Sequence, residues 1–209
     1  MIKEVIKLKL EFIEIFYKKG VLSVILCLLL GLGGVYLLLP GPQSIADFPA
    51  LPHSTKSQLE GDTIQNPNIA AYFSNSNRED ITEFYWKYFS HWNYGFLTLP
   101  LLKINHPPEF AYTYIRDQQE STGLEEYFRP MRESLFVNIN DALIYSQIRQ
   151  RPLSFDSTHL EYNGEYFSSK GTIRYFSSNP LVRVIVLILI FEATFLFTRL
   201  VLYFRKVYR

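Results

Sequence analysis

Glu192 has the most unusual setting of any residue in this sequence. It lies near the midpoint of the apolar run 181–204, which also contains Arg183 and Arg199. Ionisable groups inside a membrane segment are costly and usually face protein or water. A protonated Glu192 could hydrogen-bond a neighbouring helix and fix oligomerisation while both arginines reach the interfaces, or it could serve a proton or ion path. The structural role is favoured because two spans enclose a path only when several copies assemble.

Small residues recur in the other apolar run, 21–39. Ser23, Cys27 and Gly31 follow at four-residue intervals, with Gly34 one turn further on. This spacing lets helices approach closely, so we expect these residues to pack against the second run or against another copy of the chain. Cys27 is the only cysteine, and no intramolecular disulfide can form.

Trp86, His106 and Glu109 are the candidate surface or cleft residues outside the apolar runs. The four histidines are scattered without metal-site spacing, and no recognised catalytic or nucleotide-binding motif is present. We therefore assign no catalytic residue, no metal ligand and no cofactor. The missing motifs favour a non-enzyme, although a catalytic group assembled from distant residues stays open.

The elements that position these residues are predicted to include two transmembrane helices, at 21–39 and 181–204. Each run approaches or exceeds the roughly 20 residues that cross a bilayer. Basic residues precede the first run and follow the second, which places both termini in the cytoplasm and residues 40–180 outside it, at the cell membrane. The sequence Pro40-Gly41-Pro42 favours an uncleaved anchor over a cleaved signal peptide.

Short segments complete the cytoplasmic side of this predicted topology. Residues 1–20 combine apolar residues at helical spacing with several lysines, as in an amphipathic helix on the inner headgroup surface. A straight extension of the first span is the alternative. Residues 205–209 form the predicted cytoplasmic tail.

The segment 40–180 is predicted to fold as an extracytoplasmic α+β domain. Prolines make 40–66 an extended lead-in, which either wraps the domain or acts as a linker. The remaining expectations follow from periodicity and turn residues. They are a helix over 78–92 with a Ser76–Glu79 capping box and Trp86 on its polar face, an edge strand or loop over 97–104, a helix over 109–115, a short helix over 124–128, a strand over 133–137, and a C-terminal antiparallel β-meander formed by a hairpin around Asn163-Gly164 and a strand over 172–176.

Two segments carry a resemblance to other proteins. The stretches Ile104–Tyr112 and Leu124–Asn138 resemble segments of uncharacterised two-pass membrane proteins from candidate-phylum bacteria. The resemblance covers under a quarter of the chain. It implies a bacterial envelope setting and carries no activity or site residues.

Charge and topology together define the functional expectations. Residues 40–180 contain 16 acidic and 11 basic residues, and this net charge of −5 argues against nucleic-acid binding. The leading hypothesis is an interaction module in an envelope assembly, with the lipid bilayer and a membrane or envelope protein as partners, or a second copy in a homo-oligomer. The alternatives are an extracytoplasmic ligand sensor that signals through oligomeric helices and a cell-wall-acting hydrolase or transferase.

Overall fold

The computed structural model describes residues 24–25, 27–60, 62, 66–92, 94, 98–115 and 120–207, without the side chains of 199, 201–203 and 205–207. It divides into two compact units. Pro40–Ser178 is an α+β domain, and the described parts of Met1–Leu39 and Asn179–Arg209 are helical. The predicted α+β class is confirmed. The predictions for Ser23 and for the amphipathic helix at 1–20 lie outside the described residues.

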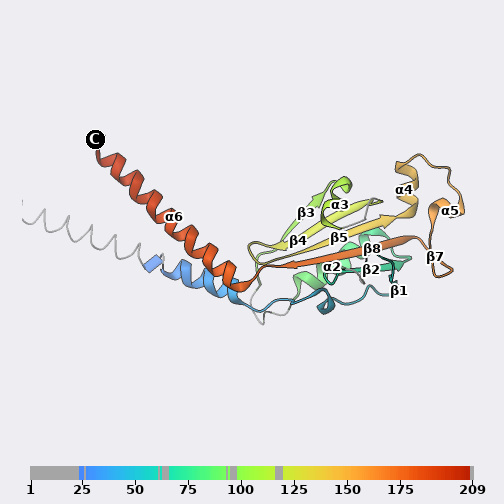
Figure 1. Cartoon of the computed structure of the whole chain (residues 1–209), viewed down its shortest axis with the longest axis horizontal. Coiled ribbons are helices and arrows are strands. Elements are labelled where there is room, and N and C mark those ends of the chain that lie inside the picture. The colour runs from blue at the N-terminus through green and yellow to red at the C-terminus, as the bar shows by residue number, and fades with distance from the viewer. Residues whose placement is uncertain are drawn as a thin grey trace, which may run out of the picture. The chain divides into compact units, whose positions relative to one another are not determined.

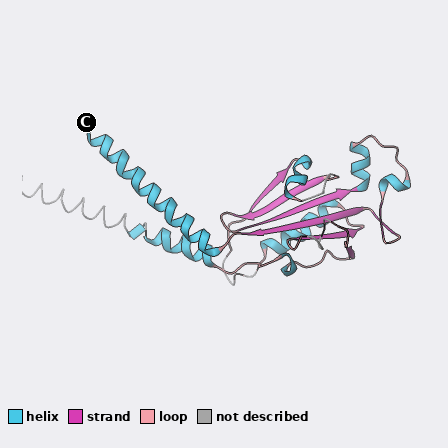
Figure 2. Ribbon diagram, in the orientation of Figure 1, coloured by secondary structure: helices cyan, strands magenta, loops and turns pink. Residues whose placement is uncertain are grey.

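A six-stranded antiparallel sheet forms the centre of the domain (Figures 1 and 2). Its spatial order is β1-β2-β8-β5-β4-β3, and a separate hairpin pairs β6 with β7. The strand bounds are β1 Ser54–Lys56, β2 Ile69–Ser74, β3 Leu102–His106, β4 Gly123–Arg129, β5 Glu133–Asp141, β6 Leu160–Tyr162, β7 Glu165–Phe167 and β8 Ser169–Ser177.

The helices of the domain are short apart from α2. Helix α2 runs over Arg78–Ser90, and a 3-10 turn, η1, covers Ile45–Asp47. The other helical elements are η2 Pro108–Phe110, α3 Ala111–Tyr114, α4 Ala142–Ile148 and α5 Phe155–Thr158. The predicted helices over 78–92 and 109–115 are thus largely present.

The main core lies between α2 and one face of the sheet. Ile81, Tyr85 and Phe89, spaced at i, i+4 and i+8, pack with the side chains of Tyr127 and Val137 in one buried cluster. These strand residues alternate with side chains on the opposite face, as the period of two in a strand requires. The buried aliphatic and aromatic residues provide the hydrophobic stabilisation of a domain that contains no disulfide.

The proline-rich lead-in wraps the domain. Ile45, Phe48 and Leu51 are buried in the main core, and the ring of Phe48 lies 5.1 Å from that of Tyr175 between centroids. The hydroxyl of Tyr88 donates a hydrogen bond to the carbonyl of Asp47 at 2.7 Å. The sequence left open whether this segment wraps around the domain or serves as a linker. These contacts show that it wraps around the domain.

The second face of the sheet is covered in two places. Helix α3 packs over Leu124 and Phe136, and the β6–β7 hairpin packs Tyr162 and Phe167 on Phe73. The hairpin turns at Asn163 and Gly164, with φ of 54° and 79°. These positive angles are those of the predicted Asn-Gly turn.

Two of the predicted secondary-structure elements were wrong. The predicted helix at 124–128 is the central part of strand β4, whose seven residues pair with β5 throughout. The predicted C-terminal β-meander does not form either, because β8 pairs with β2 and β5 instead of with β7. Strand β7 has three residues, whereas β8 pairs with β5 along its whole length and with β2 over Ser169–Arg174.

Helix α6, Pro180–Val207, is long and apolar. Within the described residues, its segment Pro180–Thr198 is the only one long and apolar enough to cross a membrane. The shorter apolar helix Cys27–Leu38 belongs to the same unit. A second span and a membrane-flanking arrangement stay predictions.

Candidate functional site

The polar residues of the helical unit occupy three different settings. Arg183 is buried, and its Nη1 donates a hydrogen bond to the carbonyl of Leu37 at 3.2 Å. It therefore ties the start of α6 to the end of the Cys27–Leu38 helix, where the last carbonyls lack helical partners. Glu192 is exposed in the isolated chain, and the side chain of Arg199 lies outside the described residues.

Of the predicted helix-packing residues, the structure describes Cys27, Gly31 and Gly34, and these do not pack closely on α6. Cys27 is exposed, and a Cβ placed on Gly31 or Gly34 would have no described neighbour within 4 Å. Instead, a Cβ on Gly33 would lie 3.5 Å from Leu187 of α6. Packing of Cys27, Gly31 and Gly34 against another copy stays a prediction.

The outer candidates do not share one cleft. Trp86 is half-buried with its ring 5.1 Å from that of Tyr127, whereas His106 Nε2 lies 2.8 Å from Glu126 Oε2, in a hydrogen bond. Tyr127 and Glu126 are neighbours on β4 and point to opposite faces, so Trp86 and His106 lie on opposite sides of the sheet. Glu109 is exposed in the turn η2.

Trp86 instead lines a polar pocket with residues that sequence reasoning missed. This pocket, of about 500 Å³, is lined by Arg78, Glu79, Thr82, Glu83, Trp86, Lys103 and Glu125. Helix α2 supplies its first five residues, and strands β3 and β4 supply the last two. The sequence did not identify Glu125 as a site residue, because residues 124–128 were predicted to be a helix. In the structure they belong to strand β4, and Glu125 is on its inward face.

Glu125 is the buried charge at the base of this polar pocket. Its Oε2 accepts a 2.8 Å hydrogen bond from Lys103 Nζ, and Arg78 Nη2 lies 3.7 Å from Oε1. The hydroxyl of Tyr127 lies 2.6 Å from Oε2 and 3.0 Å from the Thr82 carbonyl, and it donates its proton to one of them. Burial and the hydrogen bond to Glu125 raise the pKa of Tyr127, which therefore stays neutral.

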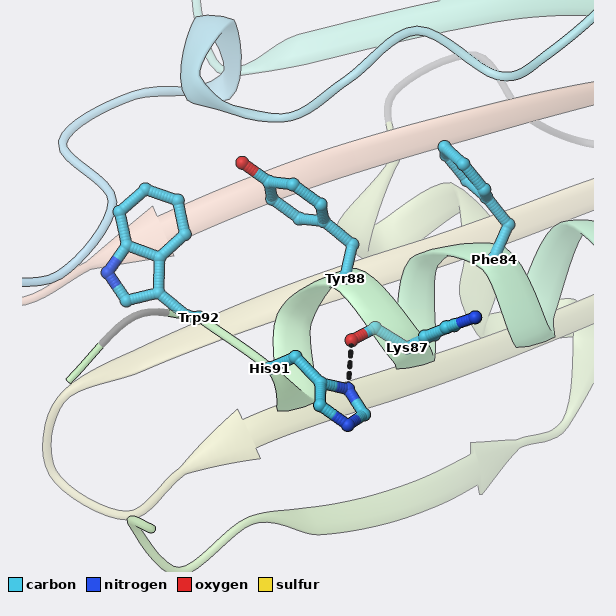
Figure 3. Close-up of a pocket in the computed structure, with 5 residues that line it drawn as sticks. All are labelled: Phe84, Lys87, Tyr88, His91 and Trp92. Carbon is cyan, nitrogen blue, oxygen red and sulfur yellow. Dashed lines mark hydrogen bonds between the residues drawn. The ribbon is translucent and has the colours of Figure 1, made fainter. Parts of the chain in front are cut away.

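An aromatic groove follows the C-terminal half of α2. It is lined by Phe84, Lys87, Tyr88, His91 and Trp92, and Figure 3 shows the three aromatic side chains on one side of the helix. Nδ1 of His91 lies 2.7 Å from the carbonyl of Lys87, and this bond helps to close the helix end. The groove has a volume of about 640 Å³ and is mainly apolar.

A second buried ionic cluster surrounds Glu133 where β5 begins. Its Oε1 lies 3.2 Å from Arg129 Nη1 and 3.5 Å from Arg132 Nη2, and it accepts a 2.8 Å hydrogen bond from the hydroxyl of Tyr94. Arg129, Arg132 and Glu133 are each at most 4% exposed. A buried ion group of this kind is stable only when each charge is paired and hydrogen-bonded.

Both ends of the domain's chain meet this ionic cluster. The hydroxyl of Tyr175 donates to the carbonyl of Pro42 at 2.7 Å, and Ser178 N donates to the carbonyl of Arg132 at 2.9 Å. A Cβ on Gly41 would approach Glu133 Oε2 to 2.5 Å, which explains the glycine there. The cluster therefore fixes the two points from which the chain continues into the helices.

Helices α4 and α5 and the β6–β7 hairpin lie at the other end of the sheet (Figure 1), and they and the loop between the two helices carry exposed apolar side chains. The rings of Phe155 and Tyr166 are in contact at 4.9 Å between centroids, and α4 and α5 are joined by a hydrogen bond from Ser146 to the Ser157 carbonyl. We call this the distal apolar surface. Its members, each 36–64% exposed, are Leu143, Ile144, Ile148, Leu153, Phe155 and Tyr166.

Among the described residues, no three His, Cys, Asp or Glu side chains gather in a way that could hold a metal ion. Comparisons with protein-family models, curated protein sequences and solved structures found no match to this chain. The class defined here is thus an α+β domain, built on an antiparallel sheet, with a C-terminal helix long and apolar enough to cross a membrane.

Proposed function

We propose that this chain is a two-pass envelope membrane protein whose domain 40–178 acts outside the cytoplasm as an interaction module. The apolar segment Pro180–Thr198 of α6 and the basic residues that follow this segment support the membrane anchor and its orientation. A bacterial envelope fits the resemblance of Ile104–Tyr112 and Leu124–Asn138.

The distal apolar surface is the observation that carries the docking role. Leu153, Ile148 and Phe155 are 64%, 60% and 55% exposed, although side chains of this kind stabilise a fold mainly when buried. Contiguous apolar patches on a soluble surface mark interaction sites. The surface lies at the end of the sheet opposite Pro42 and Ser178. Its proposed occupant is the apolar surface of another envelope protein.

The test is site-specific photocrosslinking in cells that produce the full chain. A photoreactive phenylalanine analogue at Phe155 should give a discrete heteromeric adduct, and Ile148→Asp with Leu153→Asp should reduce that adduct at least about tenfold, because charges replace buried apolar contacts. The same analogue at Leu59, which is exposed in a loop of the same domain, is the matched control.

Two outcomes would contradict this docking role. One is an adduct that survives both substitutions or forms equally from position 59. The other is an adduct with twice the 24.5 kDa mass of this chain, because that mass identifies a second copy as the occupant.

A ligand sensor is the second candidate function, and the polar pocket beside α2 favours it. That pocket contains Arg78, Lys103 and Glu125 around a half-buried indole that packs against the edge of the main core. Ligand pockets commonly join an apolar wall to a few polar groups that fix orientation. In this function, a ligand bound at α2 would alter the domain whose two chain ends continue into the helices.

A further inference from the structure

The cationic side of the polar pocket is incompletely used within the protein. Arg78 lies 3.7 Å from Glu125, which is too long for a hydrogen bond, and its side chain has no other ion pair or hydrogen bond to a described residue. Arg78 Cζ would lie 2.7 Å from a Cβ on Gly123, so the absence of a side chain there makes room for the guanidinium. The side chain of Arg78 therefore lies in the polar pocket, and its N–H groups are available to a ligand.

Lys103 adds a second cation at the same place. Its Nζ pairs with Glu125 at 2.8 Å, and its side chain is 40% exposed. Two positive charges thus share one buried carboxylate, which leaves one positive charge without a counter-charge in this group. A ligand carboxylate would supply that charge, since guanidinium and ammonium groups bind carboxylates by short charge-assisted hydrogen bonds.

The opposite charge lines the same pocket. Glu79 and Glu83 are exposed, lie one turn apart on α2, and have no ion pair with any cation that the structure describes. Residues four apart on a helix lie on the same face. Glu79 is also in the first turn, where the helix dipole favours an acid, but Glu83 lies beyond that turn and has no such role. Its carboxylate is thus available to an ammonium group.

Trp86 provides the apolar wall of the pocket. Tyr127 contacts the indole at an interplanar angle of 76°, and the residue stays half-buried. An indole face attracts both apolar groups and cations. A ligand that fills this pocket therefore needs a carboxylate, an ammonium group and an apolar part close together.

We propose that the polar pocket binds a small zwitterion of the α-amino-acid class. Arg78 and Lys103 hold its carboxylate, Glu83 holds its ammonium group with Glu79 nearby, and Trp86 contacts its side chain. This inference rests on the sensor function above and names its ligand class. It is independent of docking at the distal apolar surface.

Tryptophan fluorescence of the full chain in detergent micelles tests the proposal. The chain has two tryptophans, so Trp92→Phe leaves Trp86 as the only reporter. We expect a saturable change with at least one of glycine, L-leucine and L-phenylalanine. The amide of an amino acid lacks the carboxylate, and the N-acetyl derivative lacks the ammonium group. For the amino acid that binds, each derivative should bind at least about tenfold more weakly, because one charge-assisted contact is lost.

Variants assign the two ends of the ligand. Arg78→Gln should remove the preference for the amino acid over its amide, and Glu83→Gln should remove the preference over its N-acetyl derivative. Glu165→Gln, an exposed change on the hairpin, is the matched control and should leave both preferences intact.

Three results would overturn the zwitterion site. They are no saturable change with any of the three amino acids, an N-acetyl derivative that binds as tightly as its amino acid, or an amide that does so. None of these results affects the crosslinking from Phe155, so loss of this site and loss of the docking role are distinguished.

Discussion

Glu133 illustrates how much one buried carboxylate can decide in this domain. Its buried oxygens face Arg129, Arg132 and two tyrosine hydroxyls. Glu133→Gln keeps the size of the side chain but removes the negative charge that faces two buried guanidinium groups. We expect a loss of about 3–5 kcal/mol in the free energy of unfolding.

Urea unfolding of the full chain in detergent measures this effect. Glu165→Gln is the matched control, and an exposed change of this kind should stay within about 0.5 kcal/mol of the parent chain. If Glu133→Gln unfolded at the same urea concentration as the control, the ionic cluster would not stabilise the domain.

Tyr94 connects the Glu133 cluster to pH. Burial, and then the negative charge of Glu133, raise the pKa of Tyr94 to about 12 from its ordinary value of 10. The unfolded chain therefore loses this proton at lower pH than the folded chain, and stability falls as pH rises from about 10 to 12. Tyr94→Phe should make that fall shallower, as measured by unfolding at several alkaline pH values.

Other buried tyrosines act in the same direction, which sets the control for the Tyr94 experiment. Burial also raises the pKa of Tyr85, so part of the alkaline loss should remain in Tyr94→Phe. Tyr112→Phe, an exposed change, should leave the parent slope as it is. An unchanged slope in Tyr94→Phe would contradict the assignment.

At the scale of elements, the structure shows which of two neighbouring residues, Ser76 or Asn77, caps the start of α2. The sequence predicted a capping box from Ser76 to Glu79, but the structure places the cap at Asn77, whose Oδ1 accepts from Asp80 N at 2.8 Å. The amide of Asp80 is one of the helix donors without a helical acceptor. The prediction was therefore off by one residue.

Paired substitutions measure this cap. Asn77→Ala should destabilise the domain by about 0.5–2 kcal/mol because an orphan amide loses its acceptor, whereas Ser76→Ala should change stability by less than about 0.5 kcal/mol. Thermal unfolding of both variants is the measurement. Equal losses in the two variants, or a larger loss in Ser76→Ala, would contradict the cap at Asn77 and favour the predicted cap at Ser76.

The predicted helix at 124–128 shows why some elements could not be predicted from local pattern. Leu124, Tyr127 and Phe128 have the spacing of a helical face. In β4, however, both faces of the strand are buried, since Tyr127 packs in the main core and Leu124 packs in the separate cluster under α3. Periodicity alone does not separate a strand buried on both faces from a short helix. The segment is a strand because it pairs with β5 on one side and with β3, which is more distant in the chain, on the other.

At the scale of the whole molecule, the proposed topology predicts which residues meet the outside of the cell. Cys27 is the only cysteine, so Cys27→Ser gives a cysteine-free background. In that background Glu161→Cys, at an exposed position of the outer domain, should react with a membrane-impermeant maleimide in intact spheroplasts. Lys7→Cys should react only after lysis, because the basic end is expected inside.

This labelling separates the possible orientations of the chain. Protection of Glu161→Cys before lysis would place the domain in the cytoplasm and end the envelope proposal. Reaction of both cysteines before lysis would show that the two ends of the first apolar run face the same side. In either case the fold of the domain would stand, since it does not depend on orientation.

The sequence by itself determined the features that arise from neighbouring residues. Apolar length predicted a helix able to cross a membrane, helical spacing predicted α2, and Asn163-Gly164 predicted the hairpin turn, because each depends on contacts a few residues apart. Only the tertiary structure placed Trp86 with Glu125, brought Tyr94 and Tyr175 to Glu133, and separated Trp86 from His106. Those arrangements come from strand order and register, which join residues far apart in the chain and leave no local pattern.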